Sequence, residues 1–265
     1  MKSKLLWLFF PLVVVYLLFL FLPVLRILTF NSFSYLIADS KSGILTSVYY
    51  TYLIALGVAL IAVLFSLPYS YVMTRKNGIG YKVADSLVEI PIMIPSTVVG
   101  VMMLITFAPQ MPVGRIIARI IPGYSFTDSL FAIIVTLLFI SSAYSIRVIG
   151  VSYRQDILRY EEEAMTLGLS ETRSFFLLSV PLLLKPMIRA LILSWARAIS
   201  AVGSLLIVAY YLFPGFIKMA GVFIYNQYIS VGLPPAAASS AILIITGVIA
   251  MAILRLAGGK NAVVY

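Results

Sequence analysis

Residues 153–189 read YRQDILRYEEEAMTLGLSETRSFFLLSVPLLLKPMIR, and their charge sets them apart from the mostly apolar sequence on either side. Five of the nine acidic residues of the chain lie in this stretch. Because so many charges cannot lie in hydrocarbon, we expect the stretch to sit in water on one side of a membrane. The basic residues of the stretch and its upstream flank are Arg147, Arg154, Arg159, Arg173, Lys185 and Arg189.

The same stretch carries the local signals of two short helices. The acids Glu161–Glu163 suit a first helical turn, where the helix dipole favours negative charge. Gly168 can take the left-handed conformation that closes a helix. Ser170 is a good N-cap for a second helix, and we expect Val180-Pro181 to end it.

Composition limits the class of protein. Hydrophobic residues make up 62% of the chain, and the mean hydropathy is +1.09, which indicates a polytopic helical membrane protein. The net charge of +10 is typical of topology-setting basic loops, and we expect no nucleic-acid partner. The absence of Cys and His excludes disulfides and thiolate chemistry, and removes the commonest general base and metal ligand.

Hydropathy predicts six transmembrane helices in one domain over 1–265, with the charged segment 151–185 between the fourth and fifth. Lys2 and Lys4 before an apolar run resemble a signal peptide, but the run is long enough that we expect a retained span. Thirteen of the nineteen Lys and Arg residues fall on the side of the termini and of segment 151–185, which predicts that both termini are cytoplasmic. The predicted spans are 5–25, 48–73, 83–107, 129–149, 186–211 and 235–256.

The charged segment resembles the EAA loop of the permeases of ABC importers. Glu162-Glu163-Ala164, Gly168 and the run Leu178–Pro181 follow its spacing. The departures are Glu163 and Met165 around the alanine, and Leu178 and Val180 in place of Ile and Leu. This resemblance implies a coupling segment that contacts a separate ATPase, and an ordinary charged loop is the alternative. The coupling residues that we predict are Glu161, Glu162, Glu163, Ala164, Gly168, Leu169, Arg173 and Pro181.

A few charges fall inside or beside the predicted spans. Asp85 and Glu89 share one helical face, and we favour pairing with Arg75, Lys76 or Lys82, or with the charged segment, over a proton relay. Arg197 lies well inside the fifth span, where a charge needs a partner or a wet cavity. It either attracts an anionic substrate or is a structural arginine.

Polar and helix-breaking residues within the spans mark a candidate translocation pathway. Pro91, Pro95 and the following Ser-Thr pair should break or bend the third span, which is tolerated where a helix lines a cavity. The serines of the fifth span suit either a polar pathway or close helix packing. The predicted pathway residues are Pro95, Ser96, Thr97, Ser194, Arg197 and Ser200.

The resemblance extends to the molybdate, tungstate and sulfate branch of these permeases. Residues 194–200 with Gly203, and residues 90–100, match its signatures in the fifth and third spans, and residues 224–232 resemble the molybdate/tungstate branch. That family often has a glutamate four residues after the arginine, where this chain has Ala201. Arg197 therefore lacks its expected local partner.

The resemblance implies a membrane subunit of an importer for molybdate or tungstate. It implies a homodimer in the cell membrane, two cytoplasmic ATPase subunits and an extracytoplasmic oxyanion-binding protein. The single Gly-Lys pair, Gly259-Lys260, does not belong to a P-loop motif. We therefore expect no catalytic site, cofactor or metal in this chain, and we expect the partner ATPase to bind ATP and Mg. A permease for sulfate or another small solute, a secondary transporter and a membrane enzyme are the alternatives.

Overall fold

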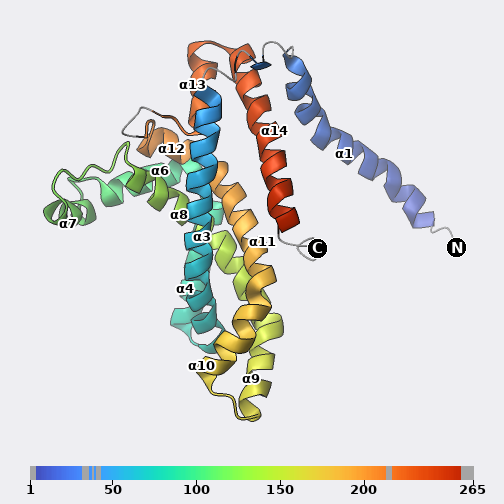
Figure 1. Ribbon diagram of the computed structural model, residues 1–265, viewed down its shortest axis with the longest axis vertical. Coiled ribbons are helices and arrows are strands. Elements are labelled where there is room, and N and C mark those ends of the chain that lie inside the picture. Colours follow the sequence, from blue (N-terminus) through green and yellow to red (C-terminus); the bar gives the residue numbers. More distant parts are fainter. Residues whose placement is uncertain (1–3, 32–35, 38, 40–42, 213–216, 258–265) are drawn as a thin grey trace.

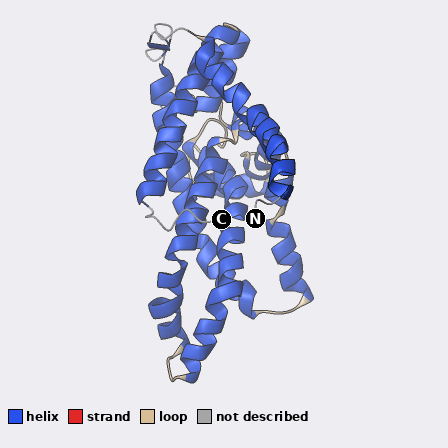
Figure 2. Cartoon of the chain, turned by 90° about the vertical axis from the view of Figure 1, so that its right-hand side faces the viewer, coloured by secondary structure: helices blue, strands red, loops and turns tan. Residues whose placement is uncertain are grey.

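The computed structural model describes residues 4–31, 36–37, 39, 43–212 and 217–257, and these are almost entirely helical (Figures 1 and 2). The predicted all-α membrane protein is confirmed. Five helices are long and apolar enough to cross a membrane, and a bent pair makes a sixth if it counts as one span. The helices are α1 (Lys4–Phe30), α3 (Leu45–Arg75), α4 (Ile79–Val88), α5 (Ile90–Met93), α6 (Ser96–Phe107), α7 (Pro112–Ile120), α8 (Leu130–Ser152), the π-helical turn η2 (Tyr153–Ile157), α9 (Leu158–Thr166), α10 (Glu171–Ser174), the π-helical turn η3 (Phe175–Ser179), α11 (Val180–Ile199), α12 (Val202–Val208), α13 (Ala220–Ser230) and α14 (Leu233–Ala257).

Helices α3, α8 and α11 form the centre of the fold, and all three run along the long axis in Figure 1. Helix α3 buries small residues, among them Ala55 and Ala59, whereas α8 buries larger ones, among them Ile133 and Leu137. Small residues on one helix let the larger ones of its neighbour approach closely. The bounds of α3 and α8 agree with the predicted spans 48–73 and 129–149 to within a few residues.

The third predicted span, 83–107, is broken, as its prolines indicated. The stretch Ile79–Met93 meets α6 at an angle of 117°. Pro95 precedes α6 with an extended backbone (ψ 140°), which a proline can adopt while its missing N–H interrupts the hydrogen-bond ladder. Helices α6 and α7 consequently leave the central bundle, at the left of Figure 1.

The fifth predicted span, 186–211, was wrong at both ends. Its helix α11 ends at Ile199, and Ala201 (ψ 45°) separates it from α12. The break brings Gly203 against α6, where a Cβ atom would lie 2.7 Å from Ser96 Oγ. Upstream, the helix continues through Pro181. That proline occupies the first turn of α11, where its missing N–H is least costly. It also follows η3, whose π-helical turn is wider than an α-helical one.

Two helices lie in predicted loops, and one predicted span stands apart. Helices α7 and α13 occupy parts of the predicted loops 108–128 and 212–233. Pro112 begins α7, at a helix position that favours proline. Helix α1 diverges from the bundle in Figure 1, and its described side chains are nearly all exposed. Such an apolar helix needs lipid or another chain around it.

Candidate functional site

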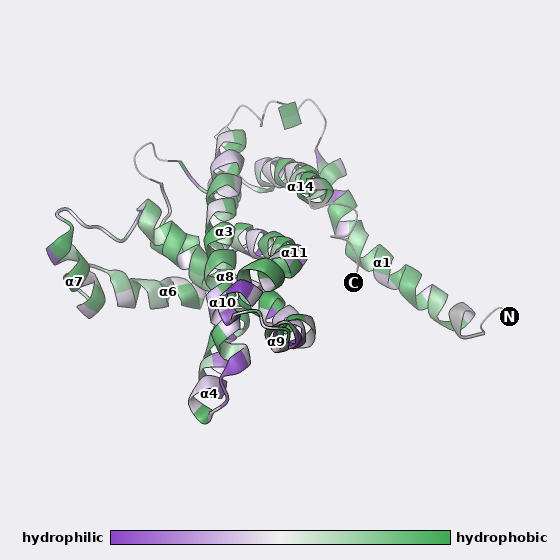
Figure 3. Cartoon of the chain, turned by 60° about the horizontal axis from the view of Figure 1, so that its bottom comes forward, coloured by the Kyte–Doolittle hydropathy of each residue, from purple (hydrophilic) through white to green (hydrophobic). Residues whose placement is uncertain are grey.

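The charged stretch folds into the α9–α10 hairpin (residues 158–174), which forms the lower end of the molecule in Figure 1 and carries polar residues in Figure 3. Gly168 has a φ of +95°, which confirms the predicted left-handed residue. In this turn Gly168 N donates to Met165 O at 3.0 Å and Leu169 N donates to Ala164 O at 3.1 Å. These bonds satisfy carbonyls at the end of α9.

The second arm of the hairpin begins as predicted and ends differently. Ser170 caps α10, and its Oγ accepts a hydrogen bond from Arg173 N at 3.4 Å. The expected stop at Val180-Pro181 was wrong, because α10, η3 and α11 follow one another as one helix from Glu171 to Ile199. The hairpin is therefore the direct extension of a spanning helix.

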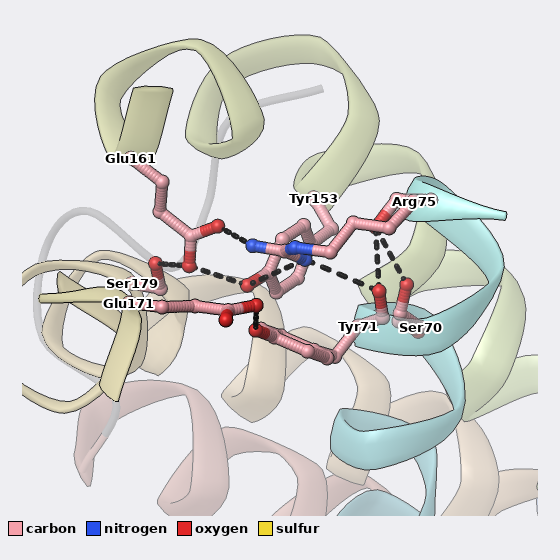
Figure 4. A network of polar contacts seen from close by, with 8 residues as sticks. Ser70, Tyr71, Arg75, Tyr153, Glu161, Glu171 and Ser179 are labelled. Carbon is pink, nitrogen blue, oxygen red and sulfur yellow. Dashed lines mark hydrogen bonds and ion pairs between the residues drawn. The ribbon is translucent and has the colours of Figure 1, made fainter. Parts of the chain in front are cut away.

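A buried carboxylate holds the hairpin to the rest of the protein (Figure 4). The side chain of Glu161 is 1% exposed. One oxygen, Oε2, forms an ion pair with Arg75, and the other, Oε1, accepts hydrogen bonds from the Tyr153 hydroxyl at 2.6 Å and from the Ser179 hydroxyl. We call these four residues the Glu161 network. A buried charge is tolerated when it is both paired and hydrogen-bonded in this way.

A second contact joins the other arm of the hairpin to the same helix end. The Tyr71 hydroxyl donates to Glu171. The Arg75 guanidinium lies 3.6 Å from the centroid of the Tyr71 ring, a cation–π arrangement, and Arg75 Nη1 donates to Tyr71 O at 3.1 Å. Both arms of the hairpin are thus attached to the last turn of α3.

The predicted coupling residues divide into an exposed set and a buried set. Glu161 and Ala164 are buried, so they cannot contact a partner directly, and the remaining ones stay a prediction. Arg159 Nε donates to Glu163 Oε1 at 2.9 Å, and this hydrogen bond raises the pKa of the Arg159 guanidinium. The exposed or partly exposed members are Glu162, Glu163, Gly168, Leu169, Arg173 and Pro181.

An open groove of about 570 Å³ lies along this hairpin. Its lining includes Leu167, Leu177 and Leu182, whose side chains are exposed, together with Tyr160. Exposed apolar side chains beside charged ones are the usual composition of a protein contact surface. The hairpin and the helix that follows it therefore carry a mixed apolar and charged surface.

The two acids of the third predicted span are paired. Arg154 lies 3.3 Å from Asp85, and Arg147 forms an ion pair with Glu89. The pairing interpretation is confirmed in its second form for Asp85, since Arg154 belongs to the charged segment 151–185, whereas the partner of Glu89, Arg147, lies upstream of that segment in α8. Arg75, one of the expected partners, binds Glu161 instead.

The candidate pathway residues gather where the two broken spans meet. Ser96 and Thr97, at the start of α6, lie against Gly203 at the start of α12, and Pro95 and Thr97 are exposed in the single chain. Ser200 and Arg197 close the end of α11, and Arg197 Nη1 donates to Ser200 Oγ at 3.2 Å. These five residues therefore share one region of the fold.

Arg197 has neutral surroundings within the described residues. Its guanidinium lies 6.0 Å from the centroid of the Tyr144 ring, and none of the four ion pairs of the described chain involves it. Its Nε is buried and forms no hydrogen bond there. The position that holds Ala201 offers no partner. A guanidinium with unused donors can take an anion.

Ser194 lies away from this group. It is buried, and its hydroxyl donates to Ser141 O at 3.1 Å, so it joins α11 to α8. This placement favours the close-packing interpretation of that serine.

Sequence reasoning missed the donors that hold Glu161. Arg75 was expected to pair with Asp85 or Glu89, and Tyr153 and Ser179 were given no role. The spacing of Tyr71 and Arg75 places both on one face of the last turn of α3, which was the available signal. Their acidic partners are distant in sequence. Glu171 is 100 residues after Tyr71, and Glu161 is 86 residues after Arg75.

Several known proteins are similar to this chain in sequence, although no family model matches it. It is 36% identical over 211 residues to the molybdate/tungstate transport system permease protein WtpB of Thermococcus kodakarensis, which covers 79% of this chain and 77% of the relative. It is 30% identical to WtpB of Methanocaldococcus jannaschii, over 91% of this chain and 92% of the relative. Sulfate transport permeases match at lower identity, 26% and 28%.

Among solved structures, the fold resembles a chain of the bacterial alginate ABC transporter that was crystallised with an alginate-bound periplasmic protein. The TM-score is 0.72, and the match covers 96% of this chain and 93% of that one at 13% identity. At this identity the likeness shows the fold.

Proposed function

Since the chain belongs to the family of molybdate/tungstate transport system permeases, we propose that it is the membrane subunit of an ABC importer for a tetrahedral oxyanion, molybdate or tungstate. The observation that carries the proposal is the identity to the Thermococcus kodakarensis permease over more than three quarters of both chains. The chain is a multi-pass membrane protein. The proposal adds that it lies in the cell membrane with both termini in the cytoplasm.

The proposed mechanism is alternating access driven from the hairpin. Two copies of the chain would bind two cytoplasmic ATPase subunits through the exposed residues of the α9–α10 hairpin, and the partner ATPase would bind ATP and Mg. Closure of the ATPase pair would displace the hairpins and move the attached helices as rigid bodies. An extracytoplasmic binding protein would deliver the oxyanion, and the presence of such a protein in the alginate transporter complex supports this.

The proposed path runs past the region where the starts of α6 and α12 meet the end of α11, because α6 and α12 themselves are in close contact at Gly203. Crossing a low-dielectric barrier is costly for a dianion, so positive potential along the path lowers the barrier. Arg197, with neutral surroundings and Ser200 beside it, supplies such potential, and a homodimer would supply it twice. Pro95, Ser96 and Thr97 would line the same passage as polar or backbone-exposing residues.

Sulfate is the second candidate, because permeases named for sulfate transport are also similar to this chain. A proton-coupled secondary transporter is disfavoured, since Asp85 and Glu89 are both engaged in ion pairs. Substrate choice among oxyanions would then depend largely on the binding protein.

ATP turnover by purified components tests the proposal. The chain alone should hydrolyse no ATP, whereas its complex with the ATPase should do so, with stimulation by a binding protein loaded with molybdate or tungstate. Stronger stimulation by the sulfate-loaded binding protein would favour the second candidate. ATP hydrolysis by the chain alone, lost on mutation of one of its own residues, would refute the proposal.

A further inference from the structure

Glu161 differs from the glutamates beside it in what it can contact. Glu162 and Glu163 are exposed, whereas the Glu161 side chain is 1% exposed. Both of its oxygens are already used by donors within the chain, Oε2 by Arg75 and Oε1 by Tyr153 and Ser179 (Figure 4). A carboxylate that is buried and hydrogen-bonded in this way presents no exposed oxygen to a partner protein. Its function must lie inside the chain.

The three donors come from three different elements. Arg75 is the last residue of α3, and Tyr153 and Ser179 belong to η2 and η3. The Arg75 guanidinium is itself fixed to α3 by its bond to Tyr71 O at 3.1 Å. The carboxylate therefore joins both π-helical turns that flank the hairpin to the end of a spanning helix.

The contact between Tyr71 and Glu171 repeats this attachment on the second arm. Helix α3 in turn packs along α8 and α11. Helices α6 and α12 lie beyond the breaks at Pro95 and Ala201. A displacement of the hairpin thus reaches the α3–α8–α11 bundle first.

We propose that Glu161 is a positioning residue that fixes the α9–α10 hairpin to α3, so that hairpin and helix move as one body during transport. This inference rests on the proposed function, because the ATPase is what would displace the hairpin. Glu161→Gln keeps the size of the side chain but leaves Arg75 without its counter-charge. The hairpin should then move without α3, while its exposed docking residues are unchanged.

The absence of cysteine in the chain permits a direct distance measurement. Spin labels at Lys76→Cys and Thr166→Cys, both exposed positions, report on the end of α3 and on α9. When only one of the two copies in the complex carries the labels, the labelled complex with its ATPase should give one narrow distance distribution, with and without ATP. Glu161→Gln should broaden it. An unchanged width in this variant would overturn the positioning role.

Two further comparisons keep the test decisive. Glu162→Gln makes the same chemical change one residue away on the exposed face, and it should leave the distance distribution narrow. Tyr153→Phe and Ser179→Ala each remove one donor but retain the ion pair, so they should broaden the distribution less than Glu161→Gln does. If Glu161→Gln fails to fold, these two variants decide, and two unbroadened distributions would overturn the inference.

Uptake in proteoliposomes separates this inference from the proposed function. With molybdate as the probe, the Glu161→Gln variant should bind the ATPase normally. It should import roughly five-fold less molybdate per ATP than the wild type, which is the lower end of ordinary coupling energies. Unchanged molybdate uptake per ATP in this variant would overturn the positioning role and leave the proposed function intact. If the wild-type complex gives narrow distances but imports sulfate instead of molybdate, and Glu161→Gln still broadens the distances, the positioning role is supported and the molybdate assignment is refuted.

Discussion

The turn of the hairpin offers a perturbation whose size follows from the structure. Gly168 lies at φ +95°, and a Cβ atom built there meets no heavy atom within 4 Å. Gly168→Val should therefore introduce backbone strain without a steric clash with the rest of the protein. The expected result is a hairpin that leaves its present shape while the spans remain inserted.

The magnitude comes from the left-handed backbone alone. An L-residue in this region costs roughly 1–2 kcal/mol, and a β-branched residue belongs at the upper end. That cost lowers the ratio of the present turn to its alternative conformations by about 5- to 30-fold. If only this shape binds the ATPase, the apparent affinity falls by up to the same factor. Gly168→Asn should retain most of the affinity, because asparagine tolerates the left-handed region.

Titration of the purified ATPase against the permease measures this effect. Gly232 is the matched control, since it also has a positive φ, +121°, with open space around it, but lies between α13 and α14. Gly232→Val should leave the ATPase affinity unchanged. Wild-type affinity in Gly168→Val, or equal loss in both variants, would refute the assignment of the hairpin as the docking site.

Three further predictions address the pathway and the buried ion pair. Arg197→Met should insert normally and slow molybdate uptake while ATP hydrolysis stays stimulated, and Arg197→Lys should retain part of the uptake, since a point charge suffices for passage; wild-type uptake in the Met variant would make this arginine structural. Gly203→Val should lower thermal stability in detergent by about 1–3 kcal/mol through overpacking against α6, whereas Gly57→Val, which meets nothing within 4 Å, should cost much less; equal losses would contradict the close packing. Arg75→Met should destabilise the fold by roughly 3 kcal/mol, because it leaves the Glu161 carboxylate buried and unpaired, and adding Glu161→Gln should restore part of this loss; additive losses in denaturant unfolding would argue against the pair.

Local chemistry carried the sequence predictions that agree with the structure. The long apolar runs of α3, α8 and α14 fix where those helices lie, because each is long enough to span and has few charges. Gly168 and Ser170 were predictable because their roles depend on backbone conformation and on a neighbour three residues away. The prolines of the third span signalled its break, although not its angle.

Features that depend on distant residues were not predictable in this way. Three consecutive glutamates look uniformly solvated, and the burial of Glu161 depends on Arg75, 86 residues earlier. The break at Ala201 has no proline or glycine at its centre that would mark it in the sequence. It accompanies the packing of α12 on α6, which involves residues distant in sequence. Pro181 looked like a helix end because η3, the turn that accommodates it, leaves no clear mark in sequence.

The central claim is that this chain imports an oxyanion at the expense of ATP hydrolysed by a partner. The most direct measurement is the uptake of labelled molybdate and tungstate into proteoliposomes that contain the permease, its ATPase and the binding protein, with ATP on the hairpin side. Uptake should require ATP and both partners, and it should persist when ion gradients are dissipated. Uptake by the permease alone, driven by a proton or sodium gradient, would contradict it.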